Sequence, residues 1–143
     1  MGLLWYKVVS PAPRARWREV LLQDPDALPS HSPEWTDAMC ANSRWRDASR
    51  LYITNEGRSF VMPMVRFGPL RRFLAIEASP RPGWGFGGIV APGGVTSADI
   101  AVVADDLAHR RPMRREIKPN PVQVDLWRGF TGMRRVPTEA HVI

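Results

Sequence analysis

The distribution of apolar and polar positions along the chain predicts short strands separated by turns. Aromatic and β-branched residues gather in brief runs, and most of these runs end at proline, glycine or asparagine, the residues that break regular structure. Strands are predicted at residues 3–9, 51–54, 59–67, 72–78 and 115–118, with a further extended run at 122–127.

Residues 51–67 have the pattern of a β-hairpin. Residues 55–57, Asn-Glu-Gly, form a tight turn between its two strands. Pro63 interrupts the second strand and has no backbone N–H to donate, so we expect it at a sheet edge or in a bulge. Gly68 and Pro69 then turn the chain into the third strand.

A first helix is expected before the hairpin. Trp17, Val20 and Leu21 have the spacing of one helical face, Pro13 suits the first turn, and Asp24 followed by proline ends the pattern.

A second helix is expected to start at Ser32, which suits the N-cap, and to end near Arg44. Its apolar face comprises Trp35, Ala38 and Met39. Cys40 is the only cysteine, so no disulfide can form within the chain, and we expect it to pack in the core.

The clearest helical pattern follows a glycine-rich stretch. Thr96 and Asp99 form a capping box at its start. Basic residues 109–111 place positive charge at the C-terminal end of the helix dipole, and Pro112 stops the helix. Its buried stripe comprises Ile100, Val103 and Leu107.

The order of these elements predicts the α+β class. A strand, two helices, a three-strand antiparallel run, a glycine-rich segment, a helix and another strand favour a mixed, largely antiparallel sheet with helices packed on it. The length of 143 residues suits a single domain, residues 1–143.

Composition argues against a disordered chain and a membrane span. Hydrophobic residues make up 44% and charged residues 24% of the sequence, as in a globular protein. No window approaches the roughly twenty apolar residues of a membrane span. The apolar run at residues 2–6 is too short for a signal peptide, so we expect a cytoplasmic location.

The formal charge of +6 comes from arginine, because Lys7 and Lys118 are the only lysines. The arginines are dispersed, many as pairs, which is typical of a solvated face and unlike a nucleic-acid-binding tail. A dedicated anion site and a basic RNA-binding domain are the alternatives.

Candidate catalytic groups are sparse. The three histidines lack the spacing of a metal site: His31 is expected in a loop, His109 at a helix end, and His141 near the terminus. Asp105 and Asp106 are adjacent on a helix and therefore face different directions, so a solvated surface is expected there. We expect no metal site and no self-contained hydrolase.

The stretch GWGFGGIV, residues 83–90, has the glycine spacing of a dinucleotide-binding loop. A phosphate-binding loop needs a helix that opens directly after it, whereas Ile89 and Val90 lead here into a turn. The glycines are therefore expected to let the backbone pass close to a neighbouring strand or to a substrate.

Four motifs resemble FemAB-like proteins of the GNAT acyltransferase superfamily in their order and spacing. They are HSPEWTDAM at 31–39, SFVMPMVR at 59–66, ASPRPGWGFGGIV at 78–90 and IKPNP at 117–121. FemAB-like proteins consist of two GNAT-type halves in tandem, and this sequence resembles the first half only. The resemblance implies a GNAT-like domain truncated at its C-terminal end, with Val142 and Ile143 beginning an unfinished strand. An open edge there predicts self-association.

By resemblance, the chain is the acceptor-binding half of an N-acyltransferase or aminoacyltransferase. The donor would be aminoacyl-tRNA or acyl-CoA, this half would bind no cofactor, and the acceptor amine would belong to a small molecule or a cell-wall precursor. A non-catalytic binding module or vestigial fragment of the same fold, with a protein or RNA partner, is the alternative. No residue can be assigned as the catalytic base.

Five residues are the predicted substrate contacts: Trp84, Gly85, Gly87, Lys118 and Asn120. Trp84 would supply an apolar wall and Lys118 an anion contact. The alternatives are that the glycines form only a bulged turn, that Trp84 only packs, and that Asn120 hydrogen-bonds its own backbone in a turn.

Overall fold

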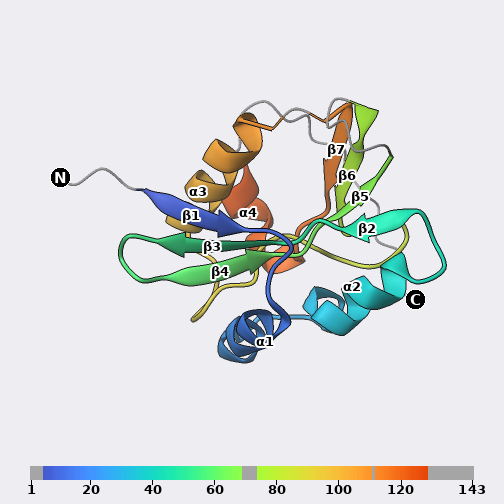
Figure 1. Cartoon of the computed structure of the whole chain (residues 1–143). Coiled ribbons are helices and arrows are strands. Elements are labelled where there is room, and N and C mark those ends of the chain that lie inside the picture. Colours follow the sequence, from blue (N-terminus) through green and yellow to red (C-terminus); the bar gives the residue numbers. More distant parts are fainter. Residues whose placement is uncertain (1–4, 69–73, 111, 129–143) are drawn as a thin grey trace.

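The computed structural model describes residues 5–68, 74–110 and 112–128 (Figure 1). The strands are β1 (Tyr6–Val9), β2 (Trp45–Asp47), β3 (Arg50–Thr54), β4 (Ser59–Met62), β5 (Val65–Phe67), β6 (Ile76–Ser79) and β7 (Arg114–Ile117). The helices are α1 (Arg14–Gln23), α2 (Pro33–Cys40), α3 (Ser97–Ala108) and α4 (Val124–Trp127), with 3-10 turns η1 (Pro29–His31) and η3 (Pro121–Gln123).

The described strands form two sheets, where a single sheet was expected. One sheet has the order β1-β3-β4 and is antiparallel throughout; the other has the order β2-β5-β6-β7. In the second sheet only β6 and β7 are parallel, and α3 lies between them in sequence. The α+β class and the largely antiparallel pairing are thus confirmed.

The two sheets separate at Pro63. The predicted second hairpin strand divides there into β4, which pairs with β3, and β5, which pairs with β2 and β6. Ala48 donates its backbone N–H to the Met64 carbonyl at 2.8 Å and so continues the pairing across the junction. Because proline cannot donate to a ladder, Pro63 marks the place where the chain leaves one sheet for the other.

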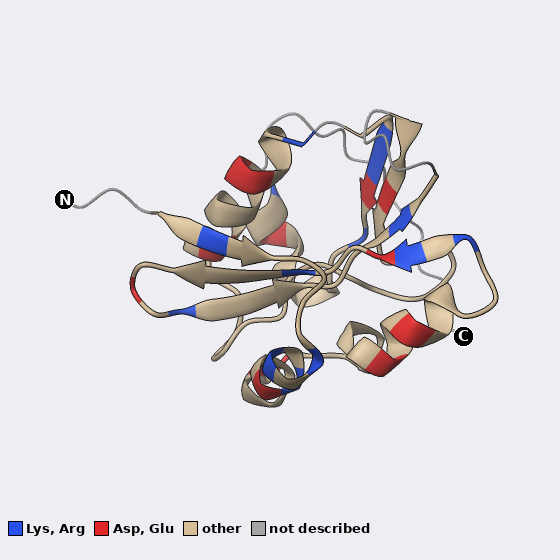
Figure 2. Ribbon diagram, in the orientation of Figure 1, with Lys and Arg blue, Asp and Glu red and all other residues tan. Residues whose placement is uncertain are grey.

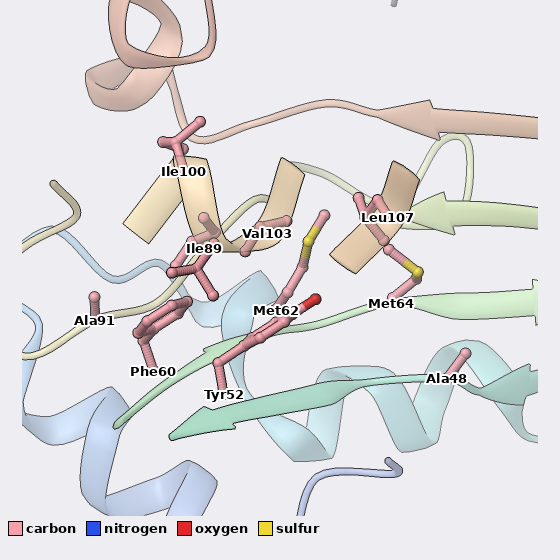
Figure 3. Close-up of a cluster of buried hydrophobic side chains, with 11 residues drawn as sticks. Ala48, Tyr52, Phe60, Met62, Met64, Ile89, Ala91, Ile100, Val103 and Leu107 are labelled. Carbon is pink, nitrogen blue, oxygen red and sulfur yellow. The ribbon is translucent and has the colours of Figure 1, made fainter. Parts of the chain in front are cut away.

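The β1-β3-β4 sheet is covered by helices on both faces (Figure 1). On one face, Trp17 and Val20 of α1 pack against Leu51 and Val61. On the other face, α3 closes the larger core cluster, in which the rings of Tyr52 and Phe60 stack at 5.2 Å. Figure 3 shows Ile100, Val103 and Leu107 of α3, Ile89, and the strand residues Phe60, Tyr52, Met62 and Met64. Successive side chains of β3 and β4 point to opposite faces of the sheet and therefore contribute to two different cores.

Helix α2 begins as predicted and ends early. The Ser32 hydroxyl accepts the Trp35 backbone N–H at 3.2 Å, which confirms the N-cap. The helix ends at Cys40, well before Arg44, and Asn42 follows with φ of 52°. The predicted face was wrong at Ala38, which is exposed, while Thr36 is buried. Strand β2, which follows the helix, was not predicted.

The capping box and the apolar stripe predicted for helix α3 are confirmed. The Thr96 hydroxyl accepts the Asp99 N–H at 3.2 Å, and Asp99 accepts the Thr96 N–H at 2.9 Å. The prediction for Asp106 was wrong, because Asp106 is buried and ion-paired to Arg50. Asp105 beside it is exposed, as expected. Arginine and lysine are spread over helices and both sheets (Figure 2).

The extended run predicted at 122–127 was also wrong, because these residues form η3 and α4. Pro121 occupies the first turn of η3, and Asn120 caps it by accepting the Val122 N–H at 3.3 Å. The C-terminal strand and its open edge, predicted within residues 133–143, lie outside the described residues.

Candidate functional site

The predicted contact residues lie where β6 and β7 end. The two strands are parallel, so their carboxyl ends meet at one edge of the sheet. Residues 80–88 leave β6 at this edge and Lys118 to Asn120 leave β7 there. Gly87 and Pro119 pair in a parallel bridge, which holds the two segments together. In open α/β sheets this edge is the place where ligands bind.

Gly87 fills the space between the two strand ends. Its N–H donates to the Lys118 carbonyl at 2.7 Å, and its carbonyl accepts the Asn120 N–H at 3.0 Å. A Cβ on Gly87 would lie 2.3 Å from the carbonyl carbon of Ser79. The expectation that a glycine lets two backbones approach closely is therefore confirmed here, with Ser79 as the neighbour.

Several backbone amides of the glycine-rich segment are already engaged. Besides Gly87, Gly88 donates to the Ser79 hydroxyl at 3.1 Å and Val90 to the Val61 carbonyl at 2.8 Å. No helix opens directly after the segment, since α3 starts at Ser97. The segment thus lacks the helix N-terminus that a phosphate-binding loop requires, in agreement with the sequence-based expectation. Gly85 has φ of +92°, and a Cβ there would lie 3.3 Å from Cβ of Ser30.

His31 fixes the glycine-rich segment from the other side. Its side chain is buried, Nδ1 accepts the Leu28 N–H at 2.8 Å, and Nε2 lies 2.8 Å from the Gly87 carbonyl oxygen. Since Nδ1 is an acceptor, Nε2 carries the hydrogen and donates it to Gly87. The sequence placed His31 in a loop and missed this contact, which joins residues 56 positions apart.

Acidification is expected to weaken the fold through His31. Burial lowers the pKa of His31 below its ordinary value, and a proton on Nδ1 would also break the bond from Leu28. Stability should therefore fall as pH drops below about 6.5, by at most about 1.4 kcal/mol per pH unit from this group. Urea unfolding between pH 7.5 and 5.5 should show a steeper pH dependence for the wild type than for His31→Gln. Equal slopes would contradict the assignment.

Trp84 belongs to a half-buried group of aromatic rings, here called the tryptophan cluster, formed by Trp35, Trp45, Trp84 and the guanidinium of Arg81. The Trp35 and Trp84 rings meet edge-to-face at 6.0 Å, and Trp35 Nε1 donates to the Trp84 carbonyl at 2.9 Å. Arg81 lies 5.8 Å from the Trp45 ring and 5.7 Å from the Trp84 ring. The cluster packs on Met39, Val65 and Ala78, and its three rings are partly accessible.

Lys118 is exposed, and its Nζ lies 4.9 Å above the ring of half-buried Phe86. Its backbone holds the strand ends together, because its N–H donates to the Ser79 carbonyl at 2.8 Å. The side chain thus presents a positive charge beside an aromatic ring at the edge of the sheet.

The side chain of Asn120 hydrogen-bonds the backbone of its own turn, which was the predicted alternative to a substrate contact. The side chain is 3% exposed; Nδ2 donates to the Asp26 carbonyl at 2.7 Å and Oδ1 accepts from Val122. With these contacts made, the amide faces the protein interior. The structure therefore brings Trp84, Gly85, Gly87 and Lys118 to one edge and places Asn120 behind them.

Two further residues of this edge were missed from the sequence. Gln123 is buried and clamps Ile89, donating through Nε2 to its carbonyl at 2.6 Å and accepting its N–H at 3.3 Å. Arg81 links Trp45 to Trp84 and donates to the Met39 carbonyl at 2.9 Å. No local pattern marked either residue, because Ile89, Trp45 and Met39 are distant from them in sequence.

Two hollows among the described residues lie elsewhere, around the β3–β4 turn. One has a volume of about 340 Å³ and is lined in part by Arg16, Glu19 and Glu56; the other has about 190 Å³ and lies beside Thr96. Within residues 5–68, 74–110 and 112–128, no three His, Cys, Asp or Glu side chains are grouped to hold a metal. None of the helices described is long and apolar enough to cross a membrane.

Comparison with protein-family models, with curated proteins and with solved structures finds no match for this chain.

Proposed function

We propose that this chain is the acceptor-binding half of a FemAB-like N-acyltransferase or aminoacyltransferase. The observation that carries the proposal is the surface at the carboxyl ends of β6 and β7, where Trp84 and Lys118 are accessible. An accessible indole and a cation suit an acceptor that combines an apolar ring face with anionic groups, as a cell-wall precursor does.

The order of elements supports the same proposal. One strand, two helices, a run of antiparallel strands, a glycine-rich segment, a helix and a parallel strand follow one another, in the order that the sequence pattern predicts, and this order is compatible with a GNAT-like α+β domain. The motif residues 78–90 and 117–121 come from distant parts of the chain and meet at this edge through the Gly87–Pro119 bridge.

The chemistry would be attack of the acceptor amine on an activated acyl group carried by aminoacyl-tRNA or acyl-CoA. The contribution of this chain would be to position the amine, which lowers the entropic part of the barrier. Trp84 would contact the body of the acceptor, and Lys118 would bind an anionic group on it.

Acceptor binding is expected to depend on Trp84 and Lys118. A nucleotide-linked sugar–pentapeptide with a free lysine amine should shift the indole N–H signals of the tryptophan cluster in ¹H–¹⁵N spectra. Trp84→Ala and Lys118→Gln should each raise the dissociation constant about tenfold, the effect of losing about 1.4 kcal/mol of contact.

The matched control is Trp5→Ala, since Trp5 is 62% exposed and lies outside the cluster. Trp84→Ala should cost only about 1–2 kcal/mol of stability, from one edge-to-face pair and one cation–π contact. A loss of about 3–5 kcal/mol would assign Trp84 to packing alone. Unchanged acceptor affinity in Trp84→Ala and Lys118→Gln would refute the proposed surface.

A non-catalytic binding module of the same fold is the second candidate. It is favoured by the form of the site, which is a surface of half-buried rings with the two described hollows lying elsewhere. Saturable acceptor binding without transfer from acyl-CoA or aminoacyl-tRNA would favour the module, whereas amide formation would favour the transferase.

A further inference from the structure

Two arginines lie directly opposite each other in the β2-β5-β6-β7 sheet. The register pairs Arg46 of β2 with Arg66 of β5, Arg66 with Glu77 of β6, and Glu77 with Arg115 of β7. Directly opposed residues point to the same face of a sheet, so these four side chains form one cross-strand row. Figure 2 shows the basic positions of β2 and β5 on neighbouring strands.

The single carboxylate of the row is already paired. Glu77 is 2% exposed, and its oxygens lie 3.1 Å from Arg110 Nη1 and 3.3 Å from Arg115 Nη2. Arg115 also donates to the Leu107 and Arg110 carbonyls, so the end of α3 covers this half of the row. Glu77 therefore does not neutralise Arg66.

The other half of the row is accessible. Arg46 is exposed and Arg66 is half-buried. Within the described part of the chain, neither guanidinium has a hydrogen bond or an ion pair. Like charges directly opposite across two strands are destabilising, and the cationic Arg110–Glu77–Arg115 group beside them adds to the positive potential. The arrangement therefore favours an anion between the two side chains.

We propose that Arg46 and Arg66 form a binding site for a phosphate group. Each guanidinium presents a planar fork of donors that matches two oxygens of an oxyanion. One carboxylate is saturated by one such fork, whereas a phosphate has enough oxygens to accept from two forks at once. The ligand is thus inorganic phosphate or the phosphate of a nucleotide or RNA backbone.

This site is independent of the proposed acyl acceptor surface. Side chains alternate along a strand, so Trp45 and Val65 project from the opposite face to Arg46 and Arg66. The tryptophan cluster, with Trp84, packs on Val65. Loss of one function should leave the other in place.

The test is a titration of the whole chain with inorganic phosphate, pyrophosphate, ADP and a ten-nucleotide RNA at constant ionic strength. Arg46→Gln and Arg66→Gln should each raise the dissociation constant of the bound probe at least about tenfold. The control is Arg114→Gln, which removes the same charge from an exposed residue of β7 on the opposite face. This control and Trp84→Ala should retain wild-type affinity.

The probe with the lowest dissociation constant identifies the source of the phosphate. Thermal unfolding in chloride should show that the two variants fold at least as stably as the wild type, because a like-charge pair is removed. Pyrophosphate should raise the melting temperature of the wild type and leave that of Arg66→Gln unchanged. Two results would overturn the proposal. One is that Arg66→Gln and Arg114→Gln bind the probe with equal affinity. The other is that no probe binds at concentrations up to about 10 mM, which is well above the dissociation constant of a weak specific complex.

Discussion

Substitution of Gly87 by alanine is expected to cost about 3 kcal/mol or more of stability. The added Cβ would lie 2.3 Å from the carbonyl carbon of Ser79 and 2.4 Å from its oxygen, and both belong to the backbone of a sheet strand. Neither atom can move without breaking the bond from Lys118 to the Ser79 carbonyl, so the clash exceeds ordinary overpacking. Urea unfolding of Gly87→Ala should show the loss, and Gly87→Val should not fold.

The matched control is Gly83→Ala in the same segment. Gly83 has φ of +83° with nothing within 4 Å of the added Cβ, so only backbone strain of about 1 kcal/mol is expected. Similar losses in the two variants would show that the Gly87–Ser79 approach is not what requires glycine.

Asp106→Ala is expected to cost about 3–5 kcal/mol. Asp106 accepts from Arg50 Nε at 2.7 Å, Arg50 Nη2 at 2.9 Å and the Tyr52 hydroxyl at 2.6 Å, and the carboxylate is almost fully buried. Burial and the Asp106 charge raise the pKa of Tyr52, which keeps its hydroxyl a donor. Without Asp106, a buried guanidinium and a buried hydroxyl remain unpaired. Chemical denaturation measures the loss.

Asp105→Ala, at the preceding position of α3, provides the comparison. Asp105 accepts one hydrogen bond, from the Tyr6 hydroxyl at 2.6 Å, in an exposed setting, so the expected cost is about 1 kcal/mol or less. Tyr52→Phe removes one of the three donors and should cost about 1 kcal/mol. If Asp106→Ala costs no more than Asp105→Ala, the buried network does not stabilise the fold.

The sequence by itself determined the elements whose signals are local. Ser32 and Trp35, or Thr96 and Asp99, are three residues apart, and their caps form from contacts within one turn of helix. The turn at residues 55–57 and the short apolar runs of β3 and β4 are equally local, so the hairpin and the α+β class could be predicted. The absence of a helix directly after GWGFGGIV could be predicted for the same reason, since the turn residues that follow it are adjacent in sequence.

Only the tertiary structure decided the features that depend on distant partners. Asp106 is buried because Arg50, 56 residues earlier, pairs with its charge and the Tyr52 hydroxyl, 54 residues earlier, donates to it; helical spacing alone cannot show this. His31 meets the Gly87 carbonyl across 56 residues, and Asn120 turns inward to reach Asp26. Such contacts form between segments that packing brings together, since a polar group buried by that packing must find a partner there.

The division into two sheets was decided in the same way. Pro63 indicated that the strand predicted at residues 59–67 is interrupted. Its missing N–H does not show, however, with which strands the residues after it pair. Residues after it leave β3 and pair with β2 and β6, because Val65 and Ala78 are buried against Met39 of α2. That packing places Arg46 opposite Arg66 and brings the ends of β6 and β7 together, and so it creates both of the surfaces proposed to bind ligands.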